Sequence, residues 1–205
     1  MRGARFVIIY EVRLWVALFR WVFRRPPRVT PGTTTHAYAG GARLLFGAFI
    51  GISAIEIPIL HLILPWPAAR VASLIVGGYG LFWMIGLLAT LHTNPHLVGP
   101  DGLRIRNSST VNVPIGWNAI AGMRVRRRSL PPGGQTQVET AGDERVLSLG
   151  VGGQTSVDVL FSRPVTVPVK KALGEPVTQI RFHADDPEAL VEAAGAYLRA
   201  AASKD

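Results

Sequence analysis

The sequence contains no cysteine among its 205 residues. Disulfide bonds, thiolate metal sites and cysteine nucleophiles are therefore excluded. Charged residues are also scarce, at 17% of the chain, whereas soluble domains carry about 25%. Together with a mean hydropathy of +0.27, this scarcity favours a membrane protein over a soluble globular one.

Acidic residues are nearly absent from the first half of the chain. Residues 1–100 contain nine Arg against only Glu11 and Glu56, whereas residues 101–205 contain 13 basic and 11 acidic residues. The net charge of +9 therefore belongs mainly to the N-terminal half, which is also the more apolar half.

Two long apolar runs, residues 44–64 and 71–91, dominate the N-terminal half. Each run corresponds to about 31 Å of helix, which matches a hydrocarbon core of about 30 Å. The link between them, residues 65–70, is so short that the two helices must form an antiparallel transmembrane hairpin. Its prolines end the first helix, and Trp66 suits the membrane interface.

Small residues recur at four-residue spacing in both runs. This spacing lets the backbones of two membrane helices approach closely, although glycine is also simply tolerated in such helices. The small residues are Gly47, Gly51, Ser73 and Gly77.

Arginines indicate how the hairpin is oriented. Eight Arg residues precede it, and only Arg70 lies in its turn. The positive-inside rule places the N-terminus in the cytoplasm and, after two crossings, residues 92–205 as well. We therefore expect a multi-pass protein of the bacterial plasma (inner) membrane with both termini cytoplasmic.

Residues 6–23 are apolar but interrupted by charges. On a helical wheel the arginines share one narrow stripe, and Glu11 lies opposite. We interpret the segment as a basic helix that lies on the cytoplasmic leaflet and contacts anionic lipids. The alternative is a third crossing, which would cost several kcal/mol for each charge at membrane depth. The residues expected at the membrane interface are Arg13, Arg20, Arg24, Arg25, Trp15 and Trp21.

From residue 95 onward the pattern changes to short alternating runs, such as residues 103–106, 111–113 and 157–159. Gly, Pro, Asn and Asp punctuate these runs at about ten-residue spacing, which is typical of an antiparallel sandwich or barrel. Parallel βαβ units are disfavoured because no helix-length segment separates the strands. Further strands are expected at residues 122–127, 137–140, 146–151, 165–169 and 178–183.

One amphipathic helix ends the chain, over residues 186–200. Asp185 or Asp186 caps it, Pro187 suits its first turn, and its apolar face allows it to close the sheet. The sequence therefore predicts an α+β membrane protein with three domains. These are residues 1–43 (basic interfacial helix and linker), 44–91 (transmembrane hairpin) and 95–205 (cytoplasmic β domain).

About seven short strands followed by one closing helix resemble the pleckstrin-homology-like (PH-like) fold. Three stretches are similar to bacterial PH-like domains: residues 99–105 (GPDGLRI), 113–123 (VPIGWNAIAGM) and 185–190 (DDPEAL). The whole chain resembles a group of uncharacterised two-helix membrane proteins from high-GC bacteria, a source that 19 Arg against 3 Lys fits. The resemblance covers residues 40–202 and implies membrane attachment and a binding module, without a known ligand.

Glu56 is the most distinctive single residue, because it lies about 18 Å along the first apolar helix. An ionisable group at that depth is a candidate functional group, either protonated or paired with a polar group of another chain. The alternative is a neutral structural carboxyl beside a kink at Pro58.

Five arginines on two expected strands are the candidate residues for binding lipid or a partner. Alternation places each set on one face, and pairing of the two strands would join them into a surface suited to phosphates or acidic peptides. A solvated sheet face is the alternative. The residues are Arg104 and Arg106 on one strand, and Arg124, Arg126 and Arg128 on the other.

The sequence shows no motif for catalysis, metal binding or nucleotide binding. His92 and His96 have metal-ligand spacing but lack the acidic partner of a zinc motif, and residues 150–153 lack the lysine of a phosphate loop. We therefore expect no enzymatic activity, cofactor or metal. Nucleic-acid binding is not expected either, because the arginines lack interleaved aromatic residues.

These observations predict a non-catalytic membrane adaptor or scaffold whose cytoplasmic domain binds a protein partner or anionic lipid. The alternative is an accessory subunit of a transporter or envelope-biogenesis complex that contacts its partner through the hairpin. A protein partner or a homo-oligomer is expected in either case.

Overall fold

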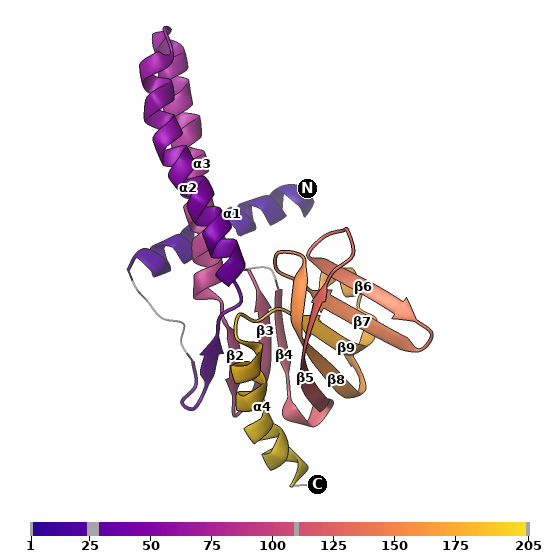
Figure 1. Ribbon diagram of the computed structural model, residues 1–205. Coiled ribbons are helices and arrows are strands. Elements are labelled where there is room, and N and C mark those ends of the chain that lie inside the picture. Colours follow the sequence, from indigo (N-terminus) through magenta and orange to yellow (C-terminus); the bar gives the residue numbers. More distant parts are fainter. Residues whose placement is uncertain (1, 24–28, 109–110, 204–205) are drawn as a thin grey trace. The chain divides into compact units, whose positions relative to one another are not determined.

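The computed structural model of the chain describes residues 2–23, 29–108 and 111–203 (Figure 1). It is an α+β structure with two long apolar helices and two open sheets. The chain divides into two units, one formed by residues 1–26 and 40–93 and the other by residues 27–39 and 94–205. The first unit is helical, and the second contains the sheets.

The helical unit contains α1 (Arg2–Val22), α2 (Gly40–Ile63) and α3 (Pro67–Thr93). Helices α2 and α3 form a hairpin, and both are long and apolar enough to cross a membrane. In the turn, Nε of Arg70 donates a hydrogen bond to the carbonyl of Leu64 at 2.6 Å. This bond satisfies an acceptor at the C-terminal end of α2 that no helical partner reaches.

The small residues of the hairpin play different roles. A Cβ added to Gly77 would lie only 2.8 Å from Cγ1 of Ile57, so α2 and α3 approach closely at this point. A Cβ added to Gly47 or Gly51 would meet no atom within 4 Å. The expectation that Gly47 and Gly51 also bring the two helices together is therefore wrong, because both face away from α3.

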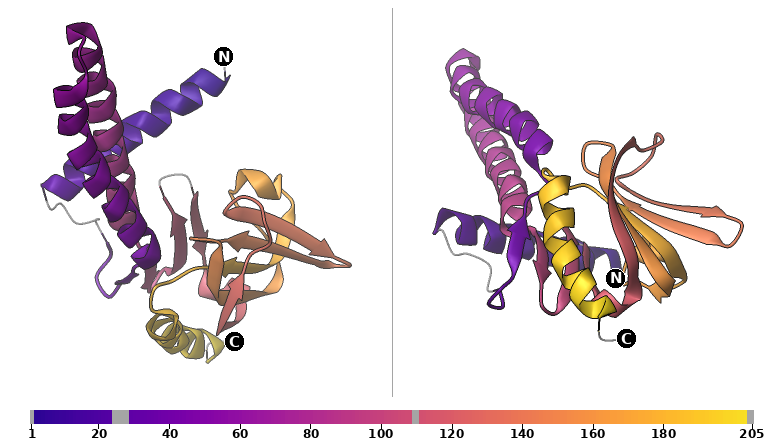
Figure 2. Two further views of the ribbon diagram at one scale, coloured as in Figure 1. Left: turned by 45° about the horizontal axis from the view of Figure 1, so that its top comes forward. Right: turned by 60° about the horizontal axis from the view of Figure 1, so that its bottom comes forward.

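Helix α1 packs across α3 (Figure 1, Figure 2). Leu14 of α1 and Gly86 of α3 are both buried, and a Cβ on Gly86 would overlap the Leu14 side chain. Farther along both helices, Trp21 stacks on His92 with 5.9 Å between the ring centroids. The Leu14 side chain thus packs directly against the backbone of Gly86, where α1 and α3 leave no space for a further side chain.

The first sheet has four antiparallel strands in the order β1-β2-β3-β4. Strand β1 comes from the segment expected to be a linker, and it pairs with β2 so that Thr34 opposes Val98. The α2–α3 hairpin is therefore inserted between two neighbouring strands of one sheet. The strands are β1 (Thr34–His36), β2 (His96–Gly99), β3 (Gly102–Asn107) and β4 (Val111–Ile115).

The second sheet has five strands in the order β5-β8-β9-β7-β6. Its pairs are antiparallel except for β7 and β9, which run parallel. Strand β8 continues to Thr166, so the separate strand expected at residues 165–169 does not form. The strands are β5 (Ile120–Ser129), β6 (Thr136–Ala141), β7 (Glu144–Leu149), β8 (Gln154–Thr166) and β9 (Pro176–Phe182).

The core of this unit lies between the two sheets and beneath α4 (Pro187–Ala202). Alternate residues of β3, β8 and β9, such as Ile105, Val157 and Phe182, have no exposed surface. Helix α4 adds Leu190 and Ala194, which are equally buried. The sheets remain open, so the barrel form of the expected fold is not observed, and the helix covers the core at one side instead.

Local contacts fix both ends of α4. The carboxylate of Asp186 accepts a hydrogen bond from the backbone N–H of Ala189 at 2.9 Å, so Asp186 is the cap of the two expected candidates, Asp185 and Asp186. Farther along, the ring of Tyr197 stacks on Trp117, and its hydroxyl donates to the carbonyl of Gly32 at 2.8 Å. The segment before β1 is thereby tied to the end of the chain.

Candidate functional site

The five predicted arginines do not share one surface. Arg104 and Arg106 lie on β3 in the four-stranded sheet, whereas Arg124, Arg126 and Arg128 lie on β5 in the five-stranded sheet. The expected pairing of these two strands does not occur, because β3 pairs with β2 and β4 while β5 pairs with β8. Their role in binding therefore stays a prediction, and the structure gives each set a separate environment.

Two of these arginines bind the same buried carboxylate. Asp158 on β8 has no exposed side-chain surface, and its oxygens lie 3.2 Å from Nε of Arg124 and 2.7 Å from Nη1 of Arg128. Nε of Arg181, on β9, lies 4.0 Å from the same carboxylate. A buried carboxylate requires cationic partners. Arg124 and Arg128 therefore have a structural role as the partners of Asp158, whether or not they also bind a ligand.

A β-bulge in β5 between Val125 and Arg128 breaks the side-chain alternation on which the prediction depended. Arg127 consequently reaches α4, where its Nη2 donates to both carboxylate oxygens of Glu188 at 2.8 and 3.1 Å. Arg126 is exposed and contacts no acid within the described part of the chain. The bulge thus separates one solvent-facing arginine from one that packs toward the helix.

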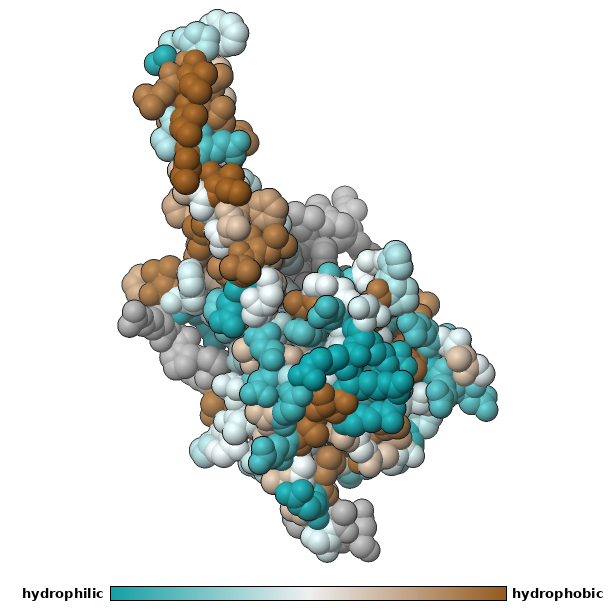
Figure 3. Space-filling view, viewed as in Figure 1, coloured by the Kyte–Doolittle hydropathy of each residue, from teal (hydrophilic) through white to brown (hydrophobic). Residues whose placement is uncertain are grey.

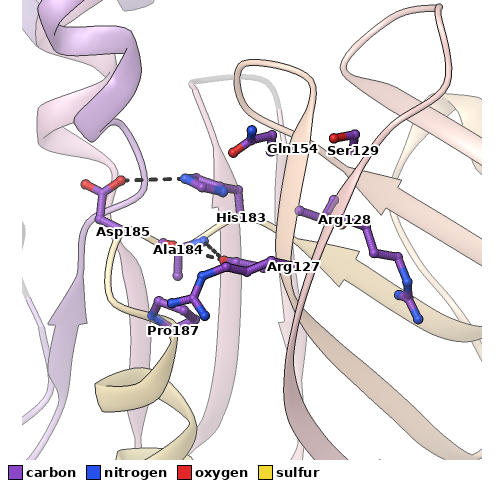
Figure 4. A pocket seen from close by; sticks show the side chains of 10 residues that line it. Arg127, Arg128, Ser129, Gln154, His183, Ala184, Asp185 and Pro187 are labelled. Carbon is purple, nitrogen blue, oxygen red and sulfur yellow. Dashed lines mark hydrogen bonds and ion pairs between the residues drawn. The ribbon is translucent and has the colours of Figure 1, made fainter.

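A polar pocket of about 290 Å³ lies beside this bulge (Figure 4). It is formed by the end of β5, the start of β8 and the turn that connects β9 to α4. Figure 4 shows His183 and Asp185 on one side of the pocket and Arg127 and Arg128 on the other. Its polar lining residues include Arg127, Arg128, Ser129, Gln154, Thr155 and His183.

Two buried polar atoms of the lining have no hydrogen-bond partner among the described residues, namely Oγ1 of Thr155 and Nδ1 of His183. Thr155 is only 1% exposed. The neighbouring Ser156 hydroxyl is satisfied, because it donates to the carbonyl of Ala184 at 3.0 Å and accepts from the N–H of Ala184 at 2.9 Å. Since buried polar atoms are nearly always paired, the Thr155 hydroxyl marks a position where a bound molecule would supply the partner.

Burial determines the charge of the pocket histidine. It lowers the pKa of His183 below its usual value, the nearby Asp185 carboxylate opposes this shift, and Arg127 adds to it. At pH 7 the imidazole is therefore neutral, and its Nε2 lies 3.8 Å from the Asp185 carboxylate without a permanent ion pair. Acidification would add a positive charge to the pocket.

Arg127 and Arg128 give the pocket donors that suit an anionic group such as a phosphate or carboxylate, whereas the Asp185 carboxylate in its lining opposes one. Arg127 and Glu188 are 65% and 59% exposed, so their ion pair contributes little stability. Each guanidinium has five N–H donors. An anion could therefore bind Arg127 and Arg128 without removing either from its present carboxylate.

Glu56 lines a separate cavity of about 340 Å³ between α2 and α3. Its side chain is exposed and has no hydrogen-bond or ion-pair partner among the described residues. This cavity is mostly apolar, in contrast to the pocket of the sheet unit. Of the predicted site residues, Arg128 thus lines the polar pocket and Glu56 lines the apolar cavity, whereas Arg104, Arg106, Arg124 and Arg126 line neither.

The residues expected at the membrane interface lie on or just after α1. Trp15 and Trp21 are 39% and 40% exposed, and Arg20 is half-buried. The side chain of Arg13, and the whole of Arg24 and Arg25, lie outside the described residues.

His92 and His96 occupy different environments. His92 lies in the helical unit against Trp21, whereas His96 is buried in the sheet unit. There its Nε2 donates to the carbonyl of His183 at 2.8 Å, and its Nδ1 accepts from the N–H of Arg106 at 3.1 Å. Within the described ranges, no three His, Asp or Glu side chains are grouped so that they could hold a metal ion.

The chain matches no protein-family model, no curated protein and no solved structure. Its function must therefore be argued from geometry. Sequence reasoning used Asp158 only as a strand marker and did not single out Thr155, Arg127 or His183. No local pattern marks these residues as a group, because they come together only through the pairing of β5, β8 and β9.

Proposed function

We propose that the protein is a non-catalytic membrane adaptor. In this proposal α2 and α3 cross a bacterial plasma membrane, and a PH-like domain on the cytoplasmic side binds the anionic group of a lipid. The observation that carries the binding function is the pocket beside the β5 bulge, which is lined by Arg127 and Arg128 and contains the unpaired Thr155 hydroxyl.

The exposed apolar surface of α2 and α3 supports membrane insertion. Leu44, Leu62 and Val76 are 82%, 78% and 71% exposed, and Figure 3 shows apolar side chains along the hairpin. Of the most apolar window of each helix, 0% is buried in α2 and 6% in α3. Because each Å² of apolar surface removed from water contributes about 25 cal/mol, the hairpin is far more stable in lipid than in water.

The pairing of β1 with β2 supports a two-crossing topology. Strands of one sheet must lie in one compartment, so the segments on either side of the hairpin return to the same side of the membrane. The excess of arginines before the hairpin favours the cytoplasm as that side.

The strand order supports a PH-like fold with one departure. Within the stretch that the resemblance covers, eight strands, β2 to β9, precede the closing helix α4, where the resemblance implies about seven. The β6–β7 hairpin adds to the free edge of β9 in parallel orientation. The pocket lies away from this addition, at the opposite end of the strand order, next to β5 and β8.

A titration of the full chain in phosphatidylcholine nanodiscs with soluble short-chain phosphatidylglycerol tests the binding function by calorimetry. Arg127→Gln and Thr155→Val should each weaken binding about tenfold, since a hydrogen bond to a charged group contributes about 1.5–3 kcal/mol. Arg126→Gln is the matched control, because Arg126 neighbours the pocket residues on β5 but does not line the pocket.

Three outcomes would contradict the proposal. The wild type could fail to bind, the control could weaken binding as much as Arg127→Gln, or inorganic phosphate could bind as tightly as the lipid. Binding of an acidic peptide in place of the lipid would favour a protein partner.

A further inference from the structure

The cavity between α2 and α3 is a groove with one carboxylate. Its volume is about 340 Å³, and Ile57, Leu60 and Met84 are among its apolar lining residues. Ser53, Glu56 and Ser73 are polar groups of the lining. The groove is too small for a whole helix, whose diameter with side chains is about 10–12 Å, but it can receive a long side chain.

Glycines shape this groove. At Gly77 the two helices approach closely, because a Cβ there would lie 2.8 Å from Cγ1 of Ile57. Gly80 also lines the groove, but a Cβ on Gly80 would meet no atom within 4 Å. The groove is therefore bounded at Gly77 by close contact between α2 and α3, and it has open space at Gly80.

Glu56 is the ionisable residue of the groove. The Ser73 hydroxyl is already engaged with the carbonyl of Arg70 at 2.9 Å, whereas Glu56 has no hydrogen-bond or ion-pair partner among the described residues. An ionisable side chain at membrane depth is costly unless it is paired. A ligand for this groove must therefore neutralise a carboxylate within an apolar surface.

We propose that the groove receives a Lys or Arg side chain from a transmembrane helix of a partner protein, which pairs with the carboxylate of Glu56. The proposal depends on the membrane insertion stated under the proposed function. It specifies that a protein partner carries a basic residue within a transmembrane helix. The polar pocket of the sheet unit says nothing about such a partner.

Charge complementarity distinguishes this occupant from a second copy of the chain. Residues 44–64 and 71–91 contain no Lys or Arg. Two copies inserted in the same orientation would place their Glu56 side chains at the same depth, so that like charges would meet. A basic residue on a different helix provides the attraction that a second copy lacks.

The test uses the full chain in phosphatidylcholine vesicles with a synthetic Leu/Ala transmembrane peptide. The peptide carries a single Lys at its centre, and the comparison peptide has Leu at that position. Because the chain has no cysteine, Ala68→Cys in the first turn of α3 provides one site for a fluorescent donor, and energy transfer to a labelled peptide reports association. The Lys peptide should associate roughly tenfold more strongly than the Leu peptide.

Three variants connect this preference to the groove. Glu56→Gln should abolish it by removing the charge, and Gly80→Leu should abolish it by filling the groove. Gly78→Leu is the matched control, because Gly78 also has open space around a Cβ but does not line the groove. This control should retain the preference for Lys.

An equal affinity for both peptides, or a Lys preference that survives Glu56→Gln, would overturn the proposal. Self-association that depends on Glu56 would also overturn the proposal. It would appear as a disulfide between two Ser53→Cys chains that forms with Glu56 and is lost with Glu56→Gln. Labelling of Ala68→Cys by an impermeant reagent, from only one side of the vesicle, checks insertion separately. A correctly inserted hairpin without a Lys preference contradicts only this inference, whereas a hairpin that does not insert contradicts the proposed function as well.

Discussion

His36 and His96 lie directly opposite each other in β1 and β2, although 60 positions separate them in the sequence. All of α2 and α3 lies between these two residues in the chain. If the hairpin crosses a membrane, a sheet that both precedes and follows it requires the hairpin to return to the side from which it started. This relationship makes the topology testable with single cysteines in a cysteine-free chain.

Single cysteines introduced at Thr30, Ala68 and Asp143 should differ in their accessibility to an impermeant reagent. In intact cells an impermeant maleimide should label Ala68→Cys at the start of α3, but Thr30→Cys and Asp143→Cys only after lysis. Thr30 precedes β1, and Asp143 lies between β6 and β7. If Thr30→Cys and Asp143→Cys were labelled from opposite sides, the pairing of β1 with β2 could not exist in the membrane.

Asp158→Asn should destabilise the sheet unit by about 2 kcal/mol. Loss of one partner of a fully buried ion pair costs about 3–5 kcal/mol, and the effect is smaller here because Arg124 is half-exposed, at 52%. Hydrogen exchange of β8 and β9 peptides in detergent, measured by mass spectrometry, should become faster. Asp143→Asn, in an exposed turn, is the control and should leave exchange unchanged.

The stability of the sheet unit should decrease below pH 6.5 because of His96. Burial lowers the pKa of His96 from 6.5 to about 4, and its hydrogen bond to the carbonyl of His183 only partly opposes the shift. The unfolded chain therefore binds a proton that the folded chain excludes. The stability from this group is complete above pH 6.5 and is lost as the pH falls toward 4, by about 3 kcal/mol in total.

Denaturant unfolding of the full chain in detergent at several pH values measures this effect. His96→Gln removes the titration but keeps a donor and an acceptor, so its stability should depend less on pH than that of the wild type. Burial also lowers the pKa values of His36 and His183, so some dependence should remain. Identical pH profiles for the wild type and His96→Gln would show that His96 is not responsible.

Gly86→Leu should detach α1 from α3. A side chain at Gly86 would overlap Leu14, which has no exposed surface, and overpacking of this kind costs about 1–3 kcal/mol. A short thiol crosslinker should join Trp21→Cys to His92→Cys in the parent chain, because the native rings stack there. Gly86→Leu should reduce that crosslink strongly. Gly78→Leu, with open space around the added side chain, should not.

Local chemistry made several elements predictable from the sequence. The two apolar runs predicted the long helices α2 and α3, because about twenty predominantly apolar residues in series suit few structures other than a membrane-length helix. Asp186 and Pro187 predicted the start of α4, because capping depends only on neighbouring residues. Leu103 and Ile105 predicted a half-buried strand, because strand alternation is equally local.

The pairing of distant segments, in contrast, could not be predicted from local patterns. The short strand Thr34–His36 carries too weak a local signal to be predicted, and its partner lies beyond the whole hairpin. The bulge in β5 turned Arg127 toward Glu188 while Arg128 reached Asp158, which alternation could not predict. The helices and the patterning of the strands thus follow from local sequence alone. The open sheets, the buried Asp158 and the pocket at Thr155 depend on long-range pairing and on the burial of polar groups, which no local pattern encodes.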